Sequence, residues 1–134
     1  MRELAGHKVN GANEKLNIVA MDEPGAGGAC HHYQIFGFNT RTNASDPFVA
    51  RHGQPASYTT ILFQNGPIGE VGVNGITHEA LLEILIDRLR SFQAGPYACE
   101  ENRWALDNLV AAQALLQTRT RNRMARGVEG TNEV

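Results

Sequence analysis

Three arginines between residues 119 and 126 have the type and the spacing needed to bind phosphate groups. Arg119, Arg123 and Arg126 fall at positions i, i+4 and i+7, which places them on one face of an expected helix. A guanidinium group forms paired hydrogen bonds with phosphate or carboxylate oxygens. A single cation would satisfy the negative end of the helix dipole, and like charges four residues apart repel each other. Three arginines on one face therefore favour a phosphate or pyrophosphate ligand over a purely structural role.

A second group of candidate residues lies in the segment Ser91–Tyr97, with Asn102 shortly after it. Phe92 ends an apolar helical stripe, so by default it would belong to the core. An aromatic ring beside an amide side chain also suits a purine, because the ring offers a stacking face and the amide offers hydrogen bonds to base or ribose. Both interpretations of Phe92 stay open at this point.

The two groups are too far apart to meet within one chain. Asn102 and Arg119 are separated by seventeen residues of the same expected helix, or about 25 Å. No nucleotide of modest size spans that distance. If both residues serve one ligand, they must come from different protomers packed antiparallel, with the hairpin tip of one against the arginine end of the other.

The remaining candidates for chemistry are weaker. Cys30, His31 and His32 are consecutive, but adjacent side chains on a strand point to opposite faces, and no second cluster supplies the missing ligands of a metal site. We expect strand-edge residues here rather than a metal site. Three carboxylates spaced at i, i+4 and i+8 are typical of a solvated helix face: Glu79, Glu83 and Asp87. We therefore expect no catalytic residue, no metal and no cofactor.

The composition is that of an ordinary globular protein with one domain, or one domain and a short appendage. The 134 residues include 12 basic and 14 acidic ones, and ten of the basic residues are Arg. A net charge of −2 disfavours long nucleic acid as a partner and favours a small anion bound locally. Cys30 and Cys99 are far apart, so we expect free thiols. No apolar stretch predicts a membrane span or a signal peptide, which indicates a cytosolic protein.

Three segments are expected along the chain. They are a weakly structured leader over 1–29, a small antiparallel sheet over 30–73, and a helical hairpin over 74–134 with an Arg-rich end and a short tail. The leader ends in a Gly-rich linker that lacks the ending of a phosphate-binding loop. Runs rich in β-branched and aromatic residues predict strands over 33–38, 58–64 and 68–73. Asn65-Gly66 between the last two predicts a β-hairpin.

The second half of the chain has a helical period. Apolar residues that repeat every three or four positions predict a helix over 77–93 with Thr77 as its N-cap. A second helix is expected over about 99–126, roughly 40 Å long. The short connection makes an antiparallel hairpin, so the fold class is α+β. The longer helix leaves Leu115 and Leu116 beyond the reach of its partner, and we therefore expect a homo-oligomer.

The segment from residue 58 to 131 resembles a family of phage proteins. The similarity runs through Ile61–Ile68, Gly72–Thr77, Glu79–Leu82, Arg88-Leu89, Phe92–Pro96, Glu101-Asn102, Ala105-Leu106, Arg119-Thr120, Arg123 and Arg126–Thr131. The family is that of Thoeris anti-defence protein 1. It shares its helical hairpin with anti-CBASS protein 2, which is also a phage protein. Residues 1–57 match this family only loosely.

The resemblance implies a sponge, which binds bacterial immune signals and holds them without degrading them. The implied ligands are glycocyclic ADP-ribose isomers made by TIR-domain proteins and, in some members, cyclic di- or trinucleotides from CBASS cyclases. The implied assembly is a homodimer or a hexamer built as a trimer of dimers, acting in the cytoplasm of the infected bacterial host. The implied ligand contacts are Phe92 on adenine, Asn102 as a polar contact, and Arg119 and Arg123 on phosphates; Arg126 is a candidate for a second, trinucleotide site.

Two other functions stay open on the sequence alone. An oligomeric nucleic-acid-binding accessory protein would use the arginine face on the phosphates of DNA or RNA, although the negative net charge disfavours it. A cyclic nucleotide phosphodiesterase would use His31 or His32 on the same ligands that a sponge would only bind.

Overall fold

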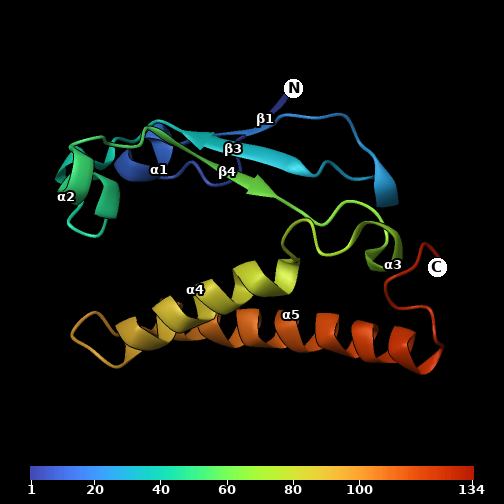
Figure 1. Ribbon diagram of the computed structural model, residues 1–134. Helices are drawn as coiled ribbons and strands as arrows, with labels where there is room; N and C mark the ends of the chain where they lie inside the picture. Colours follow the sequence, from blue (N-terminus) through green and yellow to red (C-terminus); the bar gives the residue numbers. More distant parts are fainter. The chain divides into compact units, whose positions relative to one another are not determined.

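Residues 1–65 form the first of two units in the computed structural model, which describes residues 1–134 (Figure 1). Four strands in this unit form one antiparallel sheet in the order β1-β2-β3-β4, so each strand pairs with its neighbours along the chain. They are β1 (Arg2–Leu4), β2 (Asn17–Ala20), β3 (His32–Phe36) and β4 (Tyr58–Leu62). The connections contain short helical turns: α1 (Gly11–Lys15), η1 (Ala26–Gly28), η2 (Thr40–Thr42) and α2 (Pro47–His52).

The prediction of a weakly structured leader over residues 1–29 is wrong, because this segment supplies half of the sheet. β1 pairs with β2, and β2 pairs with β3 over the register Asn17↔Phe36 to Ala20↔Tyr33. Strands of three and four residues are too short to show the period-two alternation by which strands are recognised. Their position is fixed by pairing with β3, which is a non-local interaction.

The predicted hairpin around Asn65-Gly66 is also wrong. The run after it forms a short helix, α3 (Ile68–Val71), instead of a strand. Pro67 stands at its N-cap position with φ −70°, and Gly72 ends it with φ 71°. A proline before the first turn and a glycine with a positive φ after the last favour a short helix over a strand. β4 is accordingly an edge of the sheet, and the boundary between the two units falls after Asn65.

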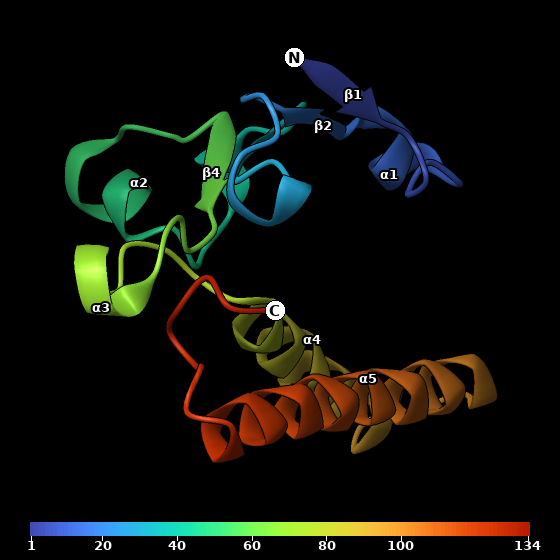
Figure 2. The same cartoon turned by 90° about the vertical axis from the view of Figure 1, so that its right-hand side faces the viewer.

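Residues 66–134 form the second unit, in which the predicted helical hairpin is confirmed. Its helices are α4 (His78–Gln93) and α5 (Glu100–Ala125), which lie side by side (Figures 1 and 2). Thr77 caps α4 by accepting a hydrogen bond from the Ala80 N–H at 3.1 Å. Cys99 caps α5 through its sulfur, which accepts from the Asn102 N–H at 3.4 Å. The expected α+β class is therefore confirmed, whereas the oligomeric state stays a prediction.

One side chain closes the loop between the two helices. The Gln93 amide donates to the Cys99 carbonyl at 3.1 Å and accepts from the Cys99 N–H at 3.1 Å. Farther along the hairpin, Gln113 on α5 donates to the Glu83 carboxylate on α4 at 2.8 Å. These contacts fix the antiparallel pairing of α4 and α5 at the loop and again in the middle.

The hairpin buries very little of its apolar surface. Ile86 is the only buried residue of α4, and α5 has none. Trp104 is 51% exposed and Leu115 is 71% exposed. The exposed apolar positions on α5 are therefore consistent with the expectation that a second copy of the chain covers them.

No helix in the structure combines the length and the apolar character needed to cross a membrane.

Gly37 offers a test of the sheet geometry. Its φ is +96°, and a Cβ atom placed there would lie 1.8 Å from the Lys15 carbonyl oxygen. We expect Gly37→Ala to lower the free energy of unfolding by at least about 2 kcal/mol, because both the backbone and the clash oppose a side chain. Urea denaturation followed by circular dichroism measures the change. Gly27→Ala is the control, since Gly27 also has a positive φ but no atom within 4 Å of the added carbon. Equal losses in both variants would contradict the close approach at Gly37.

Candidate functional site

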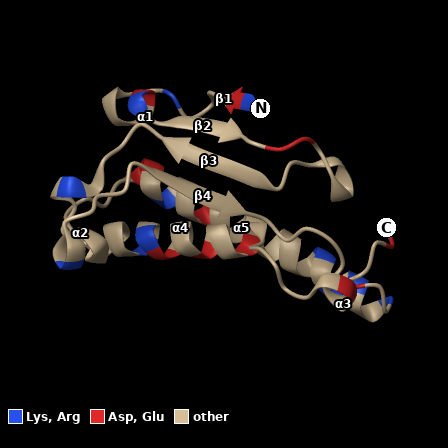
Figure 3. Ribbon diagram, turned by 45° about the horizontal axis from the view of Figure 1, so that its top comes forward, with Lys and Arg blue, Asp and Glu red and all other residues tan.

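The last turns of α5 carry a groove of about 420 Å³. The basic positions of this part of the helix appear at its far end from the hairpin loop (Figure 3). Because the lining residues of α5 recur every three or four positions, they share one face of the helix. The groove is lined by Leu115, Thr118, Arg119, Asn122, Arg123, Arg126 and Val134. The structure thus brings the three predicted arginines together at one site.

The three arginines differ in what they contact. The Arg119 side chain is exposed and makes no hydrogen bond or ion pair. Arg126 is also exposed and uses one nitrogen, Nη1, which donates to the main-chain oxygen of Val134 at 2.9 Å. Free guanidinium donors at the edge of a groove are available to an anion, and Arg119 has all of its donors available.

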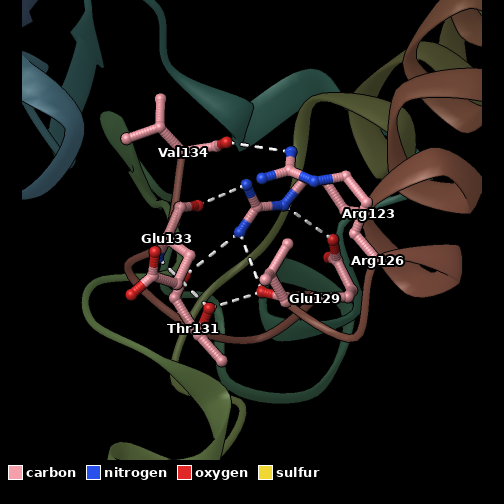
Figure 4. Close-up of polar contacts among 7 residues, drawn as sticks. Arg123, Arg126, Glu129, Thr131, Glu133 and Val134 are labelled. Atoms are coloured by element: carbon pink, nitrogen blue, oxygen red, sulfur yellow. Dashed lines mark hydrogen bonds and ion pairs between the residues drawn. The ribbon is translucent and has the colours of Figure 1, made fainter.

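Arg123 is held by the tail, which we define as residues 127–134 (Figure 4). Its side chain is only 11% exposed, and its Nε forms an ion pair with the Glu129 carboxylate at 3.0 Å. Nη2 donates to the main-chain oxygens of Val128 at 3.0 Å and Thr131 at 3.2 Å. Nη1 donates to the main-chain oxygen of Glu133. The contacts to main-chain oxygens could not be predicted from sequence, because main-chain acceptors leave no pattern of residue types.

The hairpin tip forms the second group of predicted residues. Phe92 is 39% exposed, so it is not a core residue of this chain. The centroids of the Phe92 and Tyr97 rings are 6.3 Å apart, and the rings are arranged edge to face. The Asn102 side-chain amide donates a hydrogen bond to the Tyr97 carbonyl at 3.4 Å. Phe92 and Asn102 therefore both contact Tyr97, the first through its ring and the second through its backbone carbonyl.

A cation also lies over the aromatic ring at the tip. The guanidinium carbon of Arg88 is 5.5 Å from the centroid of the Phe92 ring. An arginine four residues before an aromatic residue on a helix is the sequence signal for such a contact. Arg88 is thus a residue at the tip that the predicted site lacks.

One protomer does not bring the two groups together. Asn102 lies in the first turn of α5, and Arg119 lies near its other end. The helix runs without interruption from Glu100 to Ala125, so the expected separation of about 25 Å along its axis holds. A ligand that contacts both groups needs the tip of one chain and the arginine end of another.

His31 and His32 lie in the first unit, where their backbone N–H groups bind the side chain of Asp22. The Asp22 carboxylate accepts hydrogen bonds from the backbone N–H groups of His31 and His32, each at 3.1 Å. Desolvation opposes ionisation of Asp22, but these hydrogen bonds outweigh it and hold its pKa below the ordinary value. The His31 side chain is buried, and its Nδ1 has no hydrogen-bond partner. Among the His, Cys, Asp and Glu side chains, no group of three or more has the arrangement needed to hold a metal ion.

Comparisons with known proteins address the helical half of the chain. Residues 56–121 match the family described as "Acb2/Tad1, hairpin domain". This match includes Phe92, Asn102 and Arg119, whereas Arg123 and Arg126 lie beyond it. A protein named "Thoeris anti-defense 1" from Bacillus phage SBSphiJ7 is 45% identical over 74 residues. That alignment covers 55% of this chain and 52% of the relative, so the chain spans about half the length of the relative. Residues 56–121, which contain α4 and most of α5, thus form a hairpin domain of the Acb2/Tad1 family.

Proposed function

We propose that this protein is a phage anti-defence sponge that binds cyclic nucleotide immune signals and holds them without degrading them. The observation that carries the proposal is the unpartnered guanidinium of Arg119, which borders a groove on a hairpin of the Acb2/Tad1 family. The similarity to a Thoeris anti-defense 1 protein supports an anti-defence role. The protein would act in the cytoplasm of the infected bacterial host, where such signals are made.

The chemistry of the two groups of residues suits a ligand that contains both phosphate and a purine. Arg119 offers free donors to a phosphate or pyrophosphate. Phe92 and Tyr97 offer aromatic faces at the tip, and Asn102 offers an amide next to them. Glycocyclic ADP-ribose isomers combine these features and are our first choice of ligand. Cyclic di- and trinucleotides from CBASS cyclases have the same groups, and Arg126 is the residue that we assign to a second site for a trinucleotide.

The pocket would be completed by a second copy of the chain. The tip and the arginine end belong to opposite ends of α5, so an antiparallel pair of protomers would bring one tip to each arginine end. Exposed apolar residues on α5, including Trp104 and Leu115, supply a surface for this contact. A homodimer meets the requirement, as does a hexamer built as a trimer of dimers.

Sequestration needs affinity and abundance but no turnover. Signal that is held in a closed pocket cannot reach the defence effector, so the free concentration falls in proportion to the amount of sponge present. Arginine contacts to phosphate and a stacked base supply the affinity when the protein presents them in a fixed geometry. No step in this mechanism breaks a bond of the ligand.

Arg119 should be required for binding. We expect Arg119→Ala to weaken binding of a TIR-made glycocyclic ADP-ribose isomer by about 10- to 100-fold, because charge-assisted hydrogen bonds to phosphate are lost. Isothermal titration calorimetry measures the change. The control is Arg121→Ala, which removes the same charge from a residue that does not line the groove. Equal losses in both variants would indicate general charge attraction and contradict the assignment, as would tight, salt-dependent binding of a long oligonucleotide in place of the small ligand.

A pocket shared between protomers predicts complementation. Phe92→Ala and Arg119→Ala chains should each bind poorly alone, but a mixed dimer keeps one intact pocket, formed by the normal tip of one chain and the normal arginine end of the other. Co-expressed chains that pair at random should recover about a quarter of the wild-type binding capacity. Equilibrium dialysis against the ligand measures the capacity. Absence of any recovery in a verified mixed dimer would place the whole pocket in one chain.

The fate of the ligand separates a sponge from a phosphodiesterase. After incubation with a TIR-made signal pool, heating the protein should release an unmodified cyclic ADP-ribose isomer, identified by mass spectrometry. A parallel sample of the pool without protein shows what heating alone does to the ligand. Recovery of only a linear product would make the protein an enzyme and return His31 and His32 to consideration as its catalytic residues.

A further inference from the structure

The Arg123 guanidinium is surrounded by acceptors that belong to the tail. A guanidinium has five N–H donors, and the tail occupies four of them. Glu129 takes the Nε donor, the Val128 and Thr131 carbonyls take both donors of Nη2, and the Glu133 carbonyl takes one donor of Nη1. With 11% of its side chain exposed, Arg123 cannot bind a phosphate on two nitrogens until some of these acceptors leave.

The end of α5 turns the tail back toward Arg123. Gly127 has φ +73°, its N–H donates to the Met124 carbonyl at 3.0 Å, and the Val128 N–H donates to the Arg123 carbonyl at 3.0 Å. This pair of bonds is the Schellman pattern, which reverses the chain direction after a helix. The Thr131 N–H then donates to the Val128 carbonyl at 3.2 Å, which closes a further turn. Arg123 is thus both a residue of the helix end and the centre around which the tail folds.

Glu129 contributes the only charge among the groups that hold Arg123. A carboxylate presents to a guanidinium the same kind of oxygen acceptors as a phosphate does. The Glu129 carboxylate also offsets the mutual repulsion of the arginines spaced at i, i+4 and i+7. A phosphate brought to this position would face both a shortage of donors and a neighbouring negative charge.

We propose that the tail is an internal competitor for the arginine site: Glu129 is paired with Arg123, and a phosphate-bearing ligand must displace it. The proposal rests on the proposed function and adds a regulatory step to the same site. Arg119, which has no partner, makes the first contact, and Arg123 becomes available only when the tail releases it. Because Val134 also contacts Arg126, release of the tail frees that guanidinium as well.

The variant that tests the competition is Glu129→Gln, which keeps the size of the side chain and removes its charge. We expect it to bind a glycocyclic ADP-ribose isomer about threefold to tenfold more tightly than the wild type, because the competitor is weakened. Asp107→Asn is the control, since it removes one negative charge from an exposed position of α5 outside the groove. Equal or weaker binding by Glu129→Gln would overturn the proposal and make the tail a supporting wall of the site.

A second measurement does not depend on the identity of the natural ligand. Hydrogen exchange of the full chain should show faster exchange at the Val128 and Thr131 amides after addition of inorganic pyrophosphate, because the tail is released. Release by pyrophosphate without binding of any cyclic nucleotide would leave the competition standing and remove the proposed function. Binding of a cyclic ADP-ribose isomer with unchanged or slower exchange in the tail would overturn the competition and leave the proposed function standing.

Discussion

An uninterrupted helix of 26 residues is the constraint on which the rest of this structure depends. It keeps the aromatic tip and the arginine end of α5 apart, so in the proposed site one chain would supply two halves that belong to different pockets. The same helix exceeds α4 in length, and several of its apolar residues, including Trp104 and Leu115, stay exposed. The separation of the two groups and the exposed surface between them are therefore two results of a single feature, and both favour assembly through an antiparallel partner.

The helical half of the fold could be predicted from sequence because its determinants are local. Thr77 caps α4 and Cys99 caps α5. After each cap, apolar residues repeat every three or four positions along the helix. The sheet was predicted less well. β1 and β2 are short and depend on pairing with β3, and α3 follows from a proline and a glycine whose effect on the backbone outweighed the β-branched residues around them.

The candidate site could be predicted in its residue types but not in its connections. Arg119, Arg123 and Arg126 share a groove as their spacing indicated, and Phe92 lies near Asn102. What spacing could not distinguish is that Arg119 is free while Arg123 is held by main-chain oxygens of the tail. Identical residue types on one helix face thus differ in availability, because the chain beyond the helix returns to one of them.

The scarcity of fully buried side chains in the hairpin has a consequence for the amount of protein that the proposed function would require. Ile86 is the only buried residue of the two long helices, so an isolated hairpin gains little free energy from removing apolar surface from water. Stability that comes from association rises with protomer concentration. In the proposed oligomer, the folded fraction would rise with the amount of protein made, so the binding capacity would increase with dose more steeply than in simple proportion.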